Sequence, residues 1–227
     1  MTVVIAHRGA SRAYPENTIA AFRAAVALGA DGVEFDVRAT ADRHLAIHHD
    51  PHLPDRRALA HTLAADLPAG VTDLAAALDA CSPTLVNLEI KNDPGEPGFD
   101  RGGAPADAVV ALLRARGARD RVLVSAFHLP TIDRVKALDR GIATAWLVVD
   151  VTDETLDRLR ASGHRVLHPH YRSVTQELLS SCHEAGITVN AWTLDDPAAM
   201  RRLSAWGLDG VCTNVPDVAR RVLAASD

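Results

Sequence analysis

Aromatic residues are scarce in this chain, since Phe, Trp and Tyr together make up 4% of its 227 residues. Hydrophobic residues nevertheless account for 48% of the sequence, so Ala, Val and Leu must fill most of the core. This hydrophobic content, together with 23% charged residues, excludes a disordered chain and predicts a soluble globular protein. The length does not demand two domains, because barrels of roughly 200 to 250 residues commonly form one unit.

Cysteine is also rare, and its spacing excludes two kinds of site. Cys81, Cys182 and Cys212 are far apart in the sequence and form no CxxC pair. The sequence therefore predicts neither a disulfide framework nor a thiolate metal site. We expect three buried, apolar thiols.

The chain lacks a basic stripe and an early apolar run. Its net charge is -5, with Arg and acidic residues interspersed, which argues against nucleic acid as a partner and against a polybasic membrane patch. At the N-terminus, His7 and Arg8 interrupt the sequence before seven apolar residues accumulate. We therefore expect no signal peptide, no stable membrane association and, by default, a cytoplasmic location.

The most informative stretch is Gly32–Arg38, where apolar and charged residues alternate. This period of two predicts a strand, and it places Glu34, Asp36 and Arg38 on one face. A half-buried strand with solvated acids would show the same alternation. Other residues must join the two carboxylates before the stretch indicates a site.

Strands and helices alternate along most of the chain. We expect strands at residues 3–6, 32–38, 84–91, 121–126, 143–149, 165–168, 187–193 and 210–213. We expect helices from about 16–18 to Gly29 and at 72–80, 106–116, 129–139, 153–161, 175–185, 197–204 and 216–225. A further extended run at 45–49 precedes residues 50–71, which show no firm periodicity and are expected to be mostly loop. Eight strands, each followed by a helix, predict an α/β fold, a closed parallel (β/α)8 barrel forming a single domain over residues 1–227.

In such a barrel the carboxyl ends of the strands form one rim, where catalytic groups lie. Four of the predicted strands end in reactive or amphipathic side chains there. These residues are His7 and Arg8, Glu34 and Asp36, Glu89 and Lys91, and Trp192 and Thr193. Their convergence favours a functional site over a solvated surface.

Three carboxylates at one rim require a counter-charge. Glu34, Asp36 and Glu89 would raise one another's pKa unless they shared a cation. Oxygen ligands without cysteine favour Mg²⁺ or Ca²⁺ over zinc, with Mn²⁺ as a further option. The alternative is a set of surface ion pairs, in which Arg38 pairs with Glu34 and Asp36, and Lys91 pairs with Glu89.

Cations and histidines beside the carboxylates indicate an anionic substrate. Arg8 and Lys91 suit a phosphate that a metal bridges to the carboxylates. His7 and His49 then stand where a general base and a general acid are needed.

With these residues in place, the sequence resembles the glycerophosphodiester phosphodiesterases, a family with a TIM-barrel fold. The signature of that family is His-Arg at the first strand, Glu-x-Asp at the second and a later His-Asp. The matching segments, in chain order, are His7-Arg8-Gly9, Pro15-Glu16-Asn17-Thr18, Glu34-Phe35-Asp36, His49-Asp50, Asn87-Leu88-Glu89-Ile90-Lys91, Asn190-Ala191-Trp192-Thr193 and the run from Asp209 to Asp217. An ordered set over nearly the whole chain is more specific than any one of its parts.

The resemblance implies metal ligands, an acid/base pair and a substrate site. Glu34, Asp36 and Glu89 would bind the metal, His7 and His49 would transfer protons, and Arg8 and Lys91 would hold the phosphate. His49 is preferred to His48 because the family's histidine directly precedes an aspartate. Trp192 is interpreted as a wall for the organic part of the substrate, with a core aromatic as the alternative.

The implied reaction is metal-dependent hydrolysis of a glycerophosphodiester, a small molecule, to sn-glycerol 3-phosphate and an alcohol. One departure concerns the insertion after the second strand, which is shorter here than is usual in the family. Two alternatives remain: lysophospholipase D or phospholipase-C-like action on a lipid, and a barrel that binds glycerophosphodiesters without turnover. A lipid enzyme would need exposed apolar residues near the mouth, and the loops offer few beyond Leu53 and Phe99.

Overall fold

Parallel strands close into a barrel in the computed structural model, which describes residues 1–224. Each inner strand pairs with its sequence neighbour in the barrel, and β1 pairs with both β10 and β2, which closes the ring. The barrel strands are β1 (Val3–Ala6), β2 (Gly32–Ala39), β5 (Leu85–Ile90), β6 (Val122–Ala126), β7 (Ala143–Val148), β8 (Val166–Pro169), β9 (Thr188–Ala191) and β10 (Gly210–Thr213). The predicted (β/α)8 barrel is therefore confirmed.

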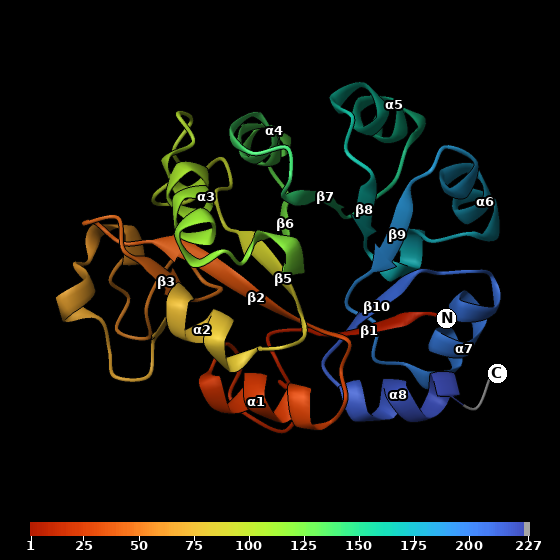
Figure 1. Ribbon diagram of the computed structural model, residues 1–227, viewed down its shortest axis with the longest axis horizontal. Coiled ribbons are helices and arrows are strands. Elements are labelled where there is room, and N and C mark those ends of the chain that lie inside the picture. Colours follow the sequence, from red (N-terminus) through yellow and green to blue (C-terminus); the bar gives the residue numbers. More distant parts are fainter. Residues whose placement is uncertain (225–227) are drawn as a thin grey trace.

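The helices form an outer ring around the strands (Figure 1). They are α1 (Ile19–Ala27), α2 (Leu74–Ala80), α3 (Ala104–Arg116), α4 (Leu129–Leu138), α5 (Asp153–Ser162), α6 (Gln176–Glu184), α7 (Pro197–Ala205) and α8 (Pro216–Ala224). Each agrees with a predicted helix to within about three residues. The predicted end of the last helix, residue 225, lies outside the described residues, as does the end of the proposed 1–227 domain.

Side-chain caps explain where several helices begin. Thr18 accepts a hydrogen bond from the backbone N–H of Ala21 at the start of α1, and Asp73 accepts one from Ala76 at the start of α2. Such caps satisfy donors that have no partner inside the helix. The first loop can therefore end abruptly at Thr18, close to the barrel rim.

A short antiparallel extension follows the second barrel strand. β3 (Leu45–Ile47) pairs with the end of β2, and β4 (Thr72–Asp73) pairs with β3. Figure 1 shows β3 projecting beyond the barrel. Between β3 and β4 lie two 3-10 turns, η1 (Leu59–His61) and η2 (Ala64–Asp66), and Leu53 and Leu59 pack with Ala46 in a small cluster of their own. The reduced insertion is thus a compact segment packed on β3.

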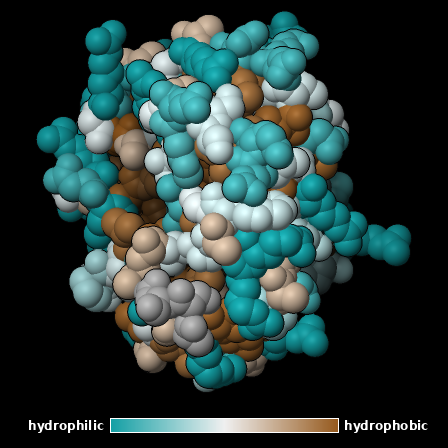
Figure 2. Space-filling view, turned by 90° about the vertical axis from the view of Figure 1, so that its right-hand side faces the viewer, coloured by the Kyte–Doolittle hydropathy of each residue, from teal (hydrophilic) through white to brown (hydrophobic). Residues whose placement is uncertain are grey.

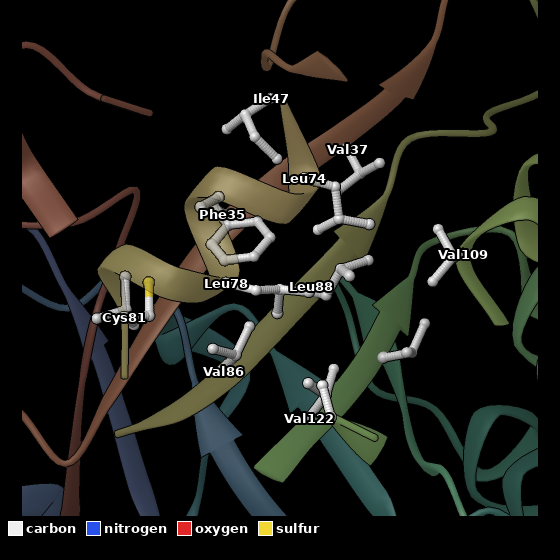
Figure 3. Packing of buried hydrophobic residues seen from close by; sticks show 14 of the residues in the cluster. Phe35, Val37, Ile47, Leu74, Leu78, Cys81, Val86, Leu88, Val109 and Val122 are labelled. Atoms are coloured by element: carbon white, nitrogen blue, oxygen red, sulfur yellow. The ribbon is translucent and has the colours of Figure 1, made fainter. Parts of the chain in front are cut away.

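The apolar core lies mainly between the strands and the helices, in two clusters. One surrounds β2 and β5, where Phe35 packs with Leu74 and Leu78 of α2 and with Leu88 of β5 (Figure 3). The other surrounds the strands β7 to β10 and includes Leu167 and Met200. Because Phe35 points outward to the helices, its neighbours Glu34 and Asp36 point into the barrel, as the alternation predicts.

The outer surface is mixed in character. Hydrophilic and hydrophobic residues are interspersed on the face shown in Figure 2. Among the described residues, no helix has the length and apolar content that a bilayer crossing requires. Cys81, Cys182 and Cys212 are free and buried, as expected.

Candidate active and metal site

A pocket of about 170 Å³ opens at the carboxyl ends of the barrel strands. Seven of the eight predicted site residues line it: His7, Arg8, Glu34, His49, Glu89, Lys91 and Trp192. The eighth, Asp36, does not line the pocket; it is only 1% exposed and lies beneath the lining residues. The parallel strands thus bring together residues that are up to 185 positions apart in the sequence.

The three predicted carboxylates meet inside the barrel. One oxygen from each of Glu34, Asp36 and Glu89 lies within 4.8 Å of the others, and Asp36 and Glu89 are direct partners in the pairing of β2 with β5. All three side chains belong to buried residues, which overturns the alternative of surface ion pairs.

Burial and mutual repulsion set the charge of these groups. Burial, with the nearby charge of Asp36, raises the pKa of Glu34 and the pKa of Glu89 to about 8 each. Burial would also raise the pKa of Asp36, but the charges of Lys91 and Arg8 outweigh it and hold that pKa below its ordinary value. If all three carboxylates are ionised, they carry one negative charge more than Arg8 and Lys91 neutralise, and burial then favours protonation of Glu34 and Glu89.

Unpartnered oxygens indicate that the cluster fits a metal ion. Glu34 Oε1 and Asp36 Oδ1 are sealed from solvent and accept no hydrogen bond from the described residues. A buried acceptor without a donor is costly, and a hard divalent cation supplies what is lacking. Glu34, Asp36 and Glu89 could therefore hold such an ion, and their all-oxygen donor set matches Mg²⁺, Ca²⁺ or Mn²⁺.

His7 is held by a chain of polar groups from the last two barrel strands. Its Nδ1 lies 2.7 Å from Asn214 Oδ1, and Asn214 Nδ2 donates to Asp195 Oδ2 at 2.7 Å. Since the Asn214 oxygen only accepts, His7 carries its proton on Nδ1 and leaves Nε2 unprotonated. Burial and the charge of Arg8 lower the pKa of His7, which keeps this imidazole neutral.

His49 follows β3 and is oriented by its neighbours. Its Nδ1 lies 2.8 Å from Asp50 Oδ1, and its backbone oxygen accepts a 2.7 Å hydrogen bond from Arg38 Nε. Arg38 also pairs with Glu96 at 2.8 Å. Arg38 thus ties the His49 loop to the loop after β5; it pairs with neither Glu34 nor Asp36.

Arg8 and Lys91 lie against the carboxylates. Arg8 Nε is 3.1 Å from Asp36 Oδ2, and its backbone N–H donates to Glu34 Oε2 at 2.8 Å. Lys91 Nζ is 2.7 Å from Glu89 Oε1 and 3.8 Å from Asp36 Oδ1. The predicted pairing of Lys91 with Glu89 is present, although it is buried in the pocket.

Aromatic side chains line part of the pocket, and one of them, Phe127, lies with its ring centroid 5.7 Å from Lys91 Nζ. Trp192 packs edge-to-face against Phe127, with 5.4 Å between ring centroids, and its Nε1 donates to the backbone oxygen of His168 at 2.7 Å. Trp192 therefore lines the pocket, and its role as a wall for the substrate stays a prediction.

Three further residues contact the predicted site residues or line the pocket, and none of them was among the predicted site residues. Asn17, which belongs to the matching segment from Pro15 to Thr18, donates from Nδ2 to Asp36 Oδ2 at 2.9 Å. Asn214 and Phe127 were not singled out, although Asn214 belongs to the matching C-terminal run. That run was the available signal for Asn214, whereas Phe127 gave none.

A larger cavity of about 470 Å³ opens at the opposite, amino-terminal mouth of the barrel. Its lining is mostly apolar and includes Val3, Ile5 and Val122, but none of the eight predicted site residues. Size alone therefore does not mark the site, which is identified by its convergent polar groups.

Comparisons with known proteins agree with one another. The model of the glycerophosphoryl diester phosphodiesterase family matches residues 7–62 and 56–218. A glycerophosphodiester phosphodiesterase of Caldanaerobacter subterraneus subsp. tengcongensis is 31% identical to this chain, with 95% of each protein covered. The structure of an Oleispira antarctica phosphodiesterase in complex with the product sn-glycerol-3-phosphate has a TM-score of 0.91 and 26% identity over 99% of this chain and 97% of that one. A glycerophosphodiester phosphodiesterase from Thermotoga maritima has a TM-score of 0.84 and 26% identity over 98% of both chains.

Proposed function

Because this chain belongs to the glycerophosphoryl diester phosphodiesterase family, we propose that it hydrolyses glycerophosphodiesters to sn-glycerol 3-phosphate and an alcohol. The observation that carries the proposal is one pocket that combines a buried carboxylate cluster, two histidines and two cations. The product bound in the Oleispira antarctica structure supports the same chemistry.

Glu34, Asp36 and Glu89 would hold the divalent ion, Mg²⁺ or Ca²⁺ in the first instance and Mn²⁺ as a further option. When bound, such an ion stabilises negative charge on phosphoryl oxygens. Arg8 and Lys91 border the cluster and would hold the phosphate by charge-assisted hydrogen bonds. Trp192 would cover the organic part of the substrate.

His7 is assigned as the general base and His49 as the general acid. His7 is neutral with a free Nε2, so it can take the proton of the attacking oxygen, which belongs either to water or to the 2-hydroxyl of the glycerol. The new P–O bond forms as the P–O bond to the alcohol breaks, and the leaving oxygen takes the Nε2 proton of a doubly protonated His49. Burial lowers the pKa of His49, whereas the charge of Asp36 and the hydrogen bond from Nδ1–H to Asp50 Oδ1 favour the protonated form that this step requires. If the 2-hydroxyl attacks, water then opens the resulting cyclic phosphate.

The lipid alternative requires exposed apolar residues near the mouth of the barrel, and one of the two candidates is buried. Leu53, one of two loop residues that could have formed an apolar entry, is 2% exposed and packs in the cluster on β3. The cytoplasmic location expected from the sequence stays a prediction.

The first experiment measures release of sn-glycerol 3-phosphate. We expect turnover of one or more of glycerophosphocholine, glycerophosphoethanolamine and glycerophosphoglycerol with added Mg²⁺, Ca²⁺ or Mn²⁺, and loss of turnover with a chelator. His7→Ala and His49→Ala should each lower kcat by roughly 10²- to 10⁴-fold, as expected for loss of a general acid or base.

His61→Ala is the matched control, because His61 is exposed on η1 and does not line the pocket. It should leave the rate unchanged. Normal turnover by His7→Ala or His49→Ala would contradict the assigned mechanism. Binding of all three diesters without turnover would favour the non-catalytic barrel, and release of product only from lysophosphatidylcholine would favour the lipid alternative.

A further inference from the structure

His168 lines the pocket but has no role in the reaction as described so far. It belongs to β8, points into the barrel and is 3% exposed. Around the ring, β8 lies four strands from β2, so His168 stands across the barrel from Glu34 and Asp36. A polar side chain placed there requires partners.

One partner of His168 determines its tautomer. Its Nε2 lies 3.0 Å from Asn190 Nδ2. An amide NH2 group donates and cannot accept, so Nε2 accepts this hydrogen bond. The single proton of the neutral imidazole must then lie on Nδ1. Burial lowers the pKa of His168 to about 3, so the ring stays neutral.

The surrounding contacts hold this pair in place. Asn190 is 6% exposed and packs so closely on Gly210 that a Cβ added to the glycine would lie 2.3 Å from Asn190 Oδ1. The backbone oxygen of His168 accepts the hydrogen bond from Trp192 Nε1. The ring thus contacts the Asn190 amide, whose Oδ1 is buried without a donor among the described residues, and the backbone of His168 contacts the Trp192 indole.

The remaining N–H opens on the pocket. Within residues 1–224, His168 Nδ1 makes no hydrogen bond to another protein atom, yet it is not among the unpartnered atoms sealed from solvent. The accessible space that His168 lines is the pocket at the carboxyl ends of the strands. Nδ1–H is therefore a donor without a partner in the described part of the chain, on a residue that lines the pocket.

The two sides of the pocket differ in charge. Arg8, Lys91 and the carboxylates come from the first three barrel strands, whereas His168 pairs with Leu147 of β7 and accepts the Trp192 hydrogen bond on its backbone oxygen. A phosphate belongs on the charged side. The part of the pocket lined by His168, Leu147, Trp192 and Thr193 carries no charged side chain and matches a carbon chain that carries a hydroxyl group.

We propose that His168 donates its Nδ1–H to a hydroxyl oxygen of the glycerol part of the substrate, and that Asn190 is a positioning residue that fixes this tautomer. The proposal rests on the proposed function, because it names how the same pocket recognises glycerol. It makes His168 a determinant of specificity for a polyol phosphate over an alkyl phosphate.

The tautomer is measured without any substrate, by the ¹⁵N shifts and long-range couplings of the histidine rings in the full-length protein. His168, assigned by comparison with His168→Asn, should be neutral with a protonated Nδ1. In Asn190→Leu this preference should be lost. A protonated Nε2 in the unsubstituted protein would overturn the proposal.

Specificity is measured by titrating two ligands, sn-glycerol 3-phosphate and n-propyl phosphate, which lacks both hydroxyl groups, in the presence of Mg²⁺. Loss of one hydrogen bond corresponds to roughly tenfold in affinity, so His168→Leu should weaken glycerol 3-phosphate binding by about that factor. Binding of n-propyl phosphate should not change, which also shows that the variant is folded. His168→Asn, whose side-chain NH2 can replace Nδ1–H, should restore most of the affinity.

The proposal would be overturned if His168→Leu weakened the binding of both ligands equally, or if it weakened the binding of neither. The proposed function fails on a different result, namely the absence of turnover for every glycerophosphodiester tested. An enzyme that releases glycerol 3-phosphate but shows no ligand-dependent effect of His168→Leu would refute only the role of His168.

Discussion

The charges of Glu34, Asp36 and Glu89 have to be balanced against those of Arg8 and Lys91. Three carboxylates and two cations lie in contact inside the barrel, which leaves one negative charge when all are ionised. A divalent ion would reverse this to one positive charge, which matches the single negative charge of a phosphodiester. Without such an ion, burial favours protonation of Glu34 and Glu89, as their raised pKa values show.

Asn17 should control the affinity of the metal site through Asp36. Its amide donates to Asp36 Oδ2, and its backbone has a φ of 58°, which glycine adopts without strain. Asn17→Gly therefore removes the donor while keeping the loop conformation. Loss of a group that orients a metal ligand typically weakens binding by about 10- to 100-fold, and we expect that loss for Mg²⁺ or Ca²⁺ in calorimetric titrations.

Arg43→Gly is the control for this experiment. Arg43 also has a positive φ, 64°, but lies exposed in the turn before β3. Its replacement should leave metal affinity unchanged. An Asn17→Gly variant that binds metal as tightly as the original chain would show that Asp36 needs no such support.

At the residue scale, the sequence predicted which side chains meet but not how each is supported. Glu34, Asp36 and Glu89 were found because period-two alternation and parallel strands fix their direction. The partner of Arg38 could not be found, since Glu96 and the His49 backbone reach it only through two loops. His168 was missed because one histidine in a short apolar strand is also typical of a core position.

At the element scale, the loop between β1 and α1 packs so closely on α1 that it has no space for a larger side chain at Gly9. It carries His7 and Arg8 and turns at Gly9, which has a φ of +83°. A Cβ at Gly9 would lie 2.6 Å from the backbone carbonyl carbon of Ala21 in α1. The loop is therefore pressed against the helix that follows it.

Gly9→Ala should both destabilise the fold and slow the reaction. The left-handed backbone alone costs an alanine about 1 to 2 kcal/mol, and the overlap with α1 adds to this. Relief of the overlap must move the loop, which displaces His7 and Arg8, so we expect kcat/KM to fall together with the free energy of unfolding in denaturant titrations.

Gly29→Ala separates the two effects. Gly29 has a similar φ of +78°, but a Cβ there would meet no atom within 4 Å. This variant should lose about 1 to 2 kcal/mol of stability for the same backbone reason, with full activity in the fraction that is folded. Equal activity of the two variants would show that the contact of Gly9 with α1 does not position the site.

The elements themselves were largely predictable, with one exception. The barrel strands and their helices follow from alternation, caps and glycine stops, and the family resemblance read from the motifs is confirmed. Residues 50–71 resisted prediction because their turns are three residues long and their apolar residues pack only on β3. Neither feature produces a period in the sequence.

At the scale of the whole molecule, the buried His168 should make stability depend on pH. Its pKa is about 3 in the folded protein, against 6.5 for an unburied histidine. Below pH 6.5, His168 binds a proton in the unfolded chain but not in the folded protein. The stability that comes from keeping His168 neutral is therefore fully present well above pH 6.5 and is lost as the pH falls below it. At pH 5.5 the loss should be about 1.4 kcal/mol.

The measurement compares denaturant unfolding of the original chain and His168→Asn at pH 7.5 and pH 5.5. Each protein loses some free energy of unfolding between pH 7.5 and pH 5.5. Because the other titrating groups are common to both proteins, the difference between these two losses is the effect of His168. The original chain should lose more stability on acidification. Equal losses in both proteins would show that folding does not lower the pKa of His168.

The position of the two apolar clusters has a consequence for evolution. Both clusters lie between strands and helices, whereas the polar residues Glu34, Glu89, Asn87, His168 and Asn190 line the two mouths of the barrel. Substitutions inside the barrel can therefore change the chemistry while the packing that folds the chain stays intact. Selection for a new alcohol, or for a new reaction, can act on one set of residues while selection for stability acts on the other.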